Sequence, residues 1–169
     1  GSGKTSTSIA LARGGFRIMT DDASVLDLTQ SRVHAWGLPR GLKVHRKTAD
    51  LMSWLQPLVG ADWDANGEQA VALSAIEPHI ALAPPVSAVV EAVVVLGARR
   101  DGTHRLECIP KSDALLEMAA DNVPWRRSGA PAHSTQTFEA LAHALLHAAA
   151  FRLNAGPDLA SLPHLFREA

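Results

Sequence analysis

The strongest structural signal in this sequence is its opening run, Gly-Ser-Gly-Lys-Thr at residues 1–5. It matches the second half of the pattern G-x-x-x-x-G-K-[ST], a loop whose backbone N–H groups surround a phosphate. The lysine of such a loop binds further phosphate oxygens, and the hydroxyl binds Mg²⁺. Because this loop joins a strand to a helix, it predicts an α/β fold. We expect the first glycine of the pattern and the preceding strand to lie upstream, so that the chain is N-terminally truncated.

The residues after this run fit the helix that the loop requires. Residues 6–13 are mainly small or apolar, and Gly14-Gly15 provides a stop, which predicts a helix over residues 5–13 and a strand at 16–19. The alternative is a Gly-Ser-rich terminus left by cloning, but such scars seldom continue into Lys-Thr and a helix. The predicted nucleotide-binding residues are Gly1, Ser2, Gly3, Lys4 and Thr5.

An acidic pair, Asp21-Asp22, follows the predicted strand, with Asp21 16 positions after Thr5. Adjacent side chains on an extended chain point in opposite directions, so we expect the two acids to have different tasks. One carboxylate would bind Mg²⁺ together with Thr5, and the other would accept the proton of an incoming hydroxyl. The alternative is an ordinary solvated turn. The phosphate-binding pattern upstream favours the functional interpretation.

The remainder of the chain predicts alternating elements in a single domain, residues 1–169. Strands are expected at 24–28, 32–36, 42–45 and 151–154, and helices at 48–58, 111–120, 134–150 and shortly after 156. Residues 89–98 predict a buried strand, and the Asp101-Gly102 turn predicts a hairpin that returns through 104–109. Hairpins beside a phosphate loop predict a mixed β-sheet flanked by helices.

Composition excludes several classes of protein. Apolar residues make up 47% and charged residues 20% of the 169 residues, which is typical of a globular domain rather than a disordered chain. A net charge of −1 argues against a broad nucleic-acid surface, so we expect no nucleic-acid partner. The apolar run at 84–96 is too short to span a bilayer, and Cys108 is the only cysteine. We expect a cytoplasmic protein without a membrane partner.

Gly-Ser-Gly-Lys-Thr, the helix after it, Gly-Gly-Phe-Arg-Ile-Met and Thr-Asp-Asp-Ala together resemble the catalytic domain of HPr kinase/phosphorylase and its bacterial serine-kinase relatives. The resemblance covers about residues 1–28. It implies a phosphoenolpyruvate carboxykinase-like fold, with ATP and Mg²⁺ as cofactors. It also implies that Lys4 and Thr5 hold ATP-Mg²⁺, that Asp21 is the base for a serine hydroxyl, and that Asp22 assists the metal. The implied acceptor is a serine in a small protein or peptide, with a small-molecule alcohol as a variant, and a homo-oligomer is allowed.

Other residues are candidates for lesser roles. Arg40 and Lys43 are candidate substrate-binding residues, because guanidinium and ammonium groups bind phosphate or an acidic acceptor, and a solvated basic face is the alternative. Arg126 is a candidate catalytic arginine for the transition state, and a surface-loop arginine is the alternative. His143 and His147 stand four apart on a predicted helix, where ordinary core or surface histidines are favoured over a metal site.

Two functions follow from these patterns. The first is a kinase that moves the γ-phosphoryl group of ATP to a hydroxyl. The second is a nucleotide-binding or nucleotide-hydrolysing regulatory module, with a binding module that performs no chemistry as a further variant. The early Asp21-Asp22 pair favours the kinase, because a hydrolytic switch needs its metal aspartate and its water-positioning residue elsewhere in the chain.

Overall fold

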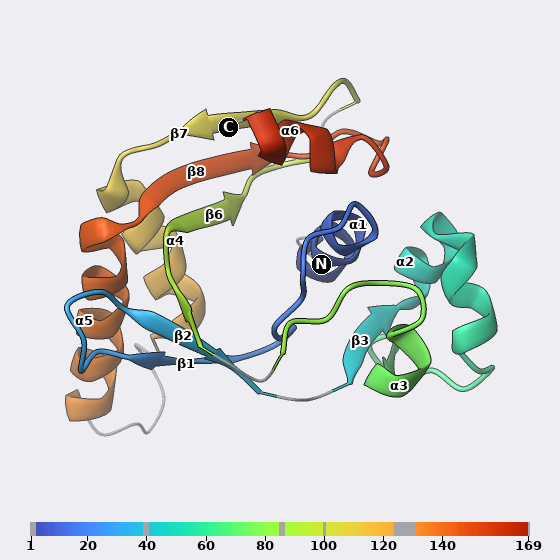
Figure 1. The fold of residues 1–169 in the computed structure, drawn as a ribbon, viewed down its shortest axis with the longest axis horizontal. Coiled ribbons are helices and arrows are strands. Elements are labelled where there is room, and N and C mark those ends of the chain that lie inside the picture. Colours follow the sequence, from blue (N-terminus) through green and yellow to red (C-terminus); the bar gives the residue numbers. More distant parts are fainter. Residues whose placement is uncertain (1–2, 39–40, 85–86, 100, 124–130, 169) are drawn as a thin grey trace. The chain divides into compact units, whose positions relative to one another are not determined.

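A computed structural model describes residues 3–38, 41–84, 87–99, 101–123 and 131–168, with the side chains of 131–133 left undescribed. The chain forms two compact units, which are treated separately below. The first contains residues 1–24, 37–86 and 158–169, and the second contains residues 25–36 and 87–157. The elements are mixed α and β with small sheets, so the α/β class predicted from the sequence is confirmed (Figure 1). The carboxykinase-like fold and the single domain stay predictions.

Helix α1 (Lys4–Arg13) is the central helix of the first unit, and it confirms the helix predicted after Thr5. Ile9, which is fully buried, lies on the side of α1 that faces the core. Ser6 is also buried, and its hydroxyl lies 2.8 Å from the hydroxyl of Thr48, so that both polar groups are satisfied inside the core. The helix ends at the predicted glycines, where Gly15 takes a φ of 95° that favours a residue without a side chain.

A two-stranded antiparallel sheet packs into the same core. Strand β3 (Leu42–His45) confirms the predicted strand at 42–45 and pairs with β4 (Glu68–Val71), which is followed by the short helix α3 (Leu73–Ile76). Helix α1 and both strands contribute to this core. Its buried residues are Ile9, Ala12, Leu42, Val44, Ala49, Leu55, Val71, Ile76 and Ile80. Helix α1 and strand β3 are therefore fixed relative to one another by shared apolar burial.

The helix predicted over 48–58 is wrong in its length. The chain forms α2 (Arg46–Leu51) and then a 3₁₀ helix, η1 (Ser53–Leu58), with a break at Met52, whose φ and ψ are −122° and 82°. Pro57 lies within η1 and lacks the N–H that an α-helix would use at that position. A 3₁₀ helix is the usual form for a short turn of this kind.

The strand predicted at 16–19 is also wrong. In the structure only Ile18 pairs, through a parallel bridge to Leu82, before the chain bends at Asp21. The end of α1 is covered by α6 (Leu162–Glu168), with the rings of Phe16 and Phe166 in an edge-to-face contact at 6.3 Å. The segment after α1 is thus held mainly by packing rather than by a sheet.

The second unit contains two three-stranded sheets and two helices, and most of its strands and helices were predicted. One sheet has the order β1 (Ser24–Asp27), β2 (His34–Gly37) and β5 (Ala88–Val89). The other has the order β6 (Ala92–Leu96), β8 (Ala149–Asn154) and β7 (Arg105–Cys108), and its helices are α4 (Lys111–Asn122) and α5 (Pro131–His147). In the parts of the chain that the structure describes, no helix has both the length and the apolar character needed to cross a membrane.

The hairpin predicted at Asp101-Gly102 is wrong, because β6 and β7 do not pair with each other. Strand β8 lies between them, parallel to β6 and antiparallel to β7 (Figure 1). The loop that carries Gly102 instead packs on Gly156, whose N–H donates to His104 Nδ1 at 2.8 Å. This sheet combines parallel and antiparallel pairing through the distant strand β8, and it belongs to the unit that does not contain α1.

We predict that Gly37→Ala lowers the free energy of unfolding by about 1–3 kcal/mol, the usual cost of overpacking. A β-carbon at Gly37 would lie 2.3 Å from the carbonyl oxygen of Met19, so the backbone leading to Asp21 would have to move. The control is Gly60→Ala, since a β-carbon there meets only the Gln69 side chain, at 3.7 Å. Urea denaturation measures both variants, and equal transition midpoints would contradict this account of the packing.

Candidate functional site

The site is built around the first turn of α1. Gly3 precedes the helix with φ 86° and ψ 14°, a left-handed conformation that favours glycine. Among the described residues no side chain caps this end, and a β-carbon at Gly3 would have no neighbour within 4 Å. The first intrahelical bond runs from Thr7 N–H to Gly3 C=O at 2.9 Å. The N–H groups before it have no acceptor within the helix and carry its positive dipole end.

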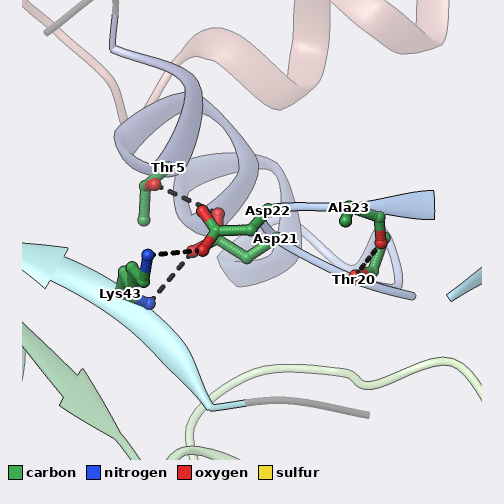
Figure 2. Close-up of polar contacts among 6 residues, drawn as sticks. All are labelled: Thr5, Thr20, Asp21, Asp22, Ala23 and Lys43. Atoms are coloured by element: carbon green, nitrogen blue, oxygen red, sulfur yellow. Dashed lines mark hydrogen bonds and ion pairs between the residues drawn. The ribbon is translucent and has the colours of Figure 1, made fainter. Parts of the chain in front are cut away.

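Asp21 and Asp22 lie in a bend, and both carboxylates point to the same side of the chain (Figure 2). The expectation that they point in opposite directions is wrong, because the chain is not extended here. The hydroxyl of Thr20 donates to Ala23 C=O at 2.8 Å and closes the turn around the acids. The bend therefore presents two carboxylates together, next to the start of α1.

Asp21 is held from two directions. Its Oδ1 accepts a hydrogen bond from Thr5 Oγ1 at 3.1 Å, and its Oδ2 accepts one from the backbone N–H of Lys43 at 3.0 Å (Figure 2). The first donor belongs to α1 and the second to β3, and both elements share one core. The half-buried Asp21 side chain thus has a fixed position although it stands in a bend.

Asp22 is more exposed and forms an ion pair with Lys43. Nζ of Lys43 lies 2.8 Å from Asp22 Oδ2, and the two side chains are 53% and 44% exposed. Strand alternation explains the placement, because Leu42 and Val44 are buried while Lys43 points away from the core. The lysine therefore contacts both acids, Asp21 through its backbone and Asp22 through its side chain.

This contact raises the pKa of Lys43 above 10.5, first through the hydrogen bond to Asp22 and then through the charge of Asp22. A raised lysine pKa contributes stability that is fully present below 10.5 and is lost as the pH rises through the raised value. Both side chains remain in contact with solvent, which screens their attraction. The pair therefore orients the site more than it stabilises the fold.

The oxygens at this site suit a hard divalent cation. Two ligands on adjacent positions of an octahedral Mg²⁺, each about 2.1 Å from the metal, lie about 3 Å from each other. The Thr5 and Asp21 oxygens are 3.1 Å apart, so this pair fits adjacent positions. Within the described residues no three His, Cys, Asp or Glu side chains gather to hold a metal alone. Phosphate oxygens and water would have to complete the coordination.

The structure brings together all of the predicted site residues that it describes. Those gathered at the start of α1 are Gly3, Lys4, Thr5, Asp21, Asp22 and Lys43. Gly1, Ser2, Arg40 and Arg126 lie outside the described residues. His143 and His147 are exposed on α5, as ordinary surface histidines are. The sequence reasoning missed the link between Lys43 and the acids, although the alternation of residues 42–44 already predicts an outward lysine.

Comparison of the chain with protein-family models, with curated proteins and with solved structures found no match. The resemblance to HPr kinase therefore stays a prediction, and the function has to be argued from the geometry of the site.

We predict that Asp22→Asn lowers the pKa of Lys43 toward 10.5, because the amide keeps the shape of Asp22 but removes its charge. An NMR titration of the lysine side-chain resonances measures the change. The control is Asp50→Asn, which removes an exposed charge from α2 in the same unit. A Lys43 pKa that is unchanged in Asp22→Asn would show that the ion pair does not form in solution.

Proposed function

We propose that this protein is a kinase that transfers the γ-phosphoryl group of ATP to a hydroxyl, most readily that of a serine in a small protein or peptide. The observation that carries the proposal is the hydrogen bond between Thr5 and Asp21 at the start of α1, beside a second carboxylate. Phosphoryl transfer depends on positioning and on charge stabilisation, and this site offers both in a few residues.

The start of α1 provides the phosphate-binding part. Its first N–H groups point out of the helix, and anions bind favourably there. Lys4 is exposed on the first turn and adds a positive charge. Thr5 and Asp21 would hold Mg²⁺, which when bound neutralises charge that develops on the phosphate oxygens. These residues bind and orient the nucleotide.

Asp22 is the residue we assign to the acceptor side. Its carboxylate would accept the proton of the acceptor hydroxyl while the hydroxyl oxygen bonds to the γ-phosphorus and the bond to the ADP oxygen breaks. The resemblance assigns these tasks the other way round, with Asp21 as base and Asp22 at the metal. The contacts support the exchanged roles, because Thr5 donates to Asp21 whereas Asp22 is more exposed and stands outside that bond.

The acceptor we propose is consistent with the charge of the chain. A net charge of −1 gives no broad electrostatic attraction to nucleic acid. Binding of a peptide or a small alcohol does not require such an attraction. ATP is available in the cytoplasm, where we propose that the protein acts.

The two aspartates should fail in different ways when each is changed to asparagine. Asp22→Asn should slow phosphoryl transfer by about 10²–10⁴-fold without weakening ATP binding, because the base is lost while every proposed nucleotide contact is kept. Asp21→Asn should raise the Mg²⁺ concentration for half-maximal activity by at least about tenfold, the lower end for loss of a metal-site partner. Radiolabelled ATP with serine peptides measures both effects in the full-length protein.

Asp50→Asn serves as the control, since it removes an exposed charge on α2 and should leave transfer unchanged. Transfer at the normal rate by Asp22→Asn would exclude Asp22 as the base. Release of labelled inorganic phosphate by the unmodified protein, with no label on any hydroxyl, would replace the kinase with a nucleotide-hydrolysing module.

A further inference from the structure

The function proposed above gives no role to the two contacts that Lys43 makes with the acids. Its backbone N–H fixes Asp21 at 3.0 Å, while its ammonium group pairs with Asp22 at 2.8 Å (Figure 2). One residue thus supplies a fixed polar contact to the metal-side acid and a movable charge to the acceptor-side acid.

We propose that Lys43 is a tethered counter-ion, which pairs with Asp22 while the site holds no nucleotide and moves its ammonium group to a nucleotide phosphate when one binds. This proposal rests on the proposed function, because it takes the nucleotide and the divalent cation to bind beside Asp21 and Asp22. It concerns binding only, and no covalent bond changes.

The charges explain both positions of the lysine. Two neighbouring carboxylates repel each other, and the ammonium group of Lys43 offsets that repulsion where it pairs with Asp22. A divalent cation at Thr5 and Asp21 would offset it more strongly, so the ammonium group would then be repelled. The lysine stem is flexible, and phosphate oxygens offer the ammonium a new anionic partner. Asp22 would then be free to accept a proton from the acceptor.

Substitution of Lys43 isolates the side-chain charge. The hydrogen bond to Asp21 comes from the backbone and persists whatever side chain stands at this position. The pairing of Lys43 with Ala70 across β3 and β4 also belongs to the backbone. Because the side chain is 53% exposed, Lys43→Met should leave the fold intact. Lys47, an exposed lysine on α2 in the same unit, provides a matched control.

The test measures two affinities of the full-length protein separately, at low ionic strength. Binding of Mn²⁺ without nucleotide is followed by electron paramagnetic resonance, since Mn²⁺ prefers the same oxygen ligands as Mg²⁺. Binding of ATP in the presence of EDTA is followed by calorimetry. Lys43→Met should bind Mn²⁺ about three- to tenfold more tightly and ATP about three- to tenfold more weakly. Both differences should shrink in 1 M salt.

The two affinity changes, tighter for Mn²⁺ and weaker for ATP, distinguish a counter-ion from the alternative roles of Lys43. A purely structural lysine would weaken both affinities when replaced, and a solvated lysine would change neither. Lys43→Arg keeps the charge and should stay close to the unmodified protein in both assays, and Lys47→Met should do the same. Circular dichroism checks that each variant is folded.

Mn²⁺ affinity that is equal or weaker in Lys43→Met overturns the proposal, whatever the kinase assay shows. ATP affinity that is equal or tighter in Lys43→Met also overturns it. Opposite shifts in a protein that labels no hydroxyl would support the counter-ion role while rejecting the kinase, so the two proposals fail separately.

Discussion

The hydrogen bond from Thr5 to Asp21 joins the start of α1 to a bend 16 positions later, and the arrangement of the site depends on it. A bend alone would not fix a carboxylate. Here, however, α1 is anchored by buried Ile9 and β3 by buried Leu42, so the two donors to Asp21 are held by one apolar core. Packing of the two elements thus positions an acid that belongs to neither of them, and this gives a residue in a bend the fixed position that the proposed phosphoryl transfer would need.

The parts of the site that depend on local chemistry could be predicted from the sequence. The helix after Thr5 and its end at Gly14-Gly15 can be read from residue types alone, and Gly15 takes the left-handed φ that glycine allows. The strand at 42–45 follows from alternation of apolar and polar residues. The nearness of Asp21 to Thr5 was also expected, because the phosphate-binding pattern that Thr5 completes calls for an acidic partner at the metal.

The parts that depend on distant residues could not be predicted. The Asp101-Gly102 turn favours a hairpin locally, but β8, which begins at Ala149, occupies the place between β6 and β7. Nothing within the turn encodes that strand. The common direction of Asp21 and Asp22 was missed for a local reason instead, because the hydroxyl of Thr20 donates to Ala23 C=O in a bend where an extended chain was expected. At the hairpin, local propensity fails because tertiary contacts override it. At the two acids, a local turn takes the place of the predicted strand end.

The exposure of the site has a consequence for the choice of acceptor. Asp22 and Lys43 are 44% and 53% exposed, so water reaches the proposed base as easily as an alcohol does. Transfer to a hydroxyl requires that this water be excluded, which also lowers the local dielectric constant and strengthens every charge interaction at the site. A small alcohol has too few atoms to cover the bend and the first turn of α1. A peptide segment has enough, so the openness of the site is consistent with the polypeptide serine that we propose as the acceptor.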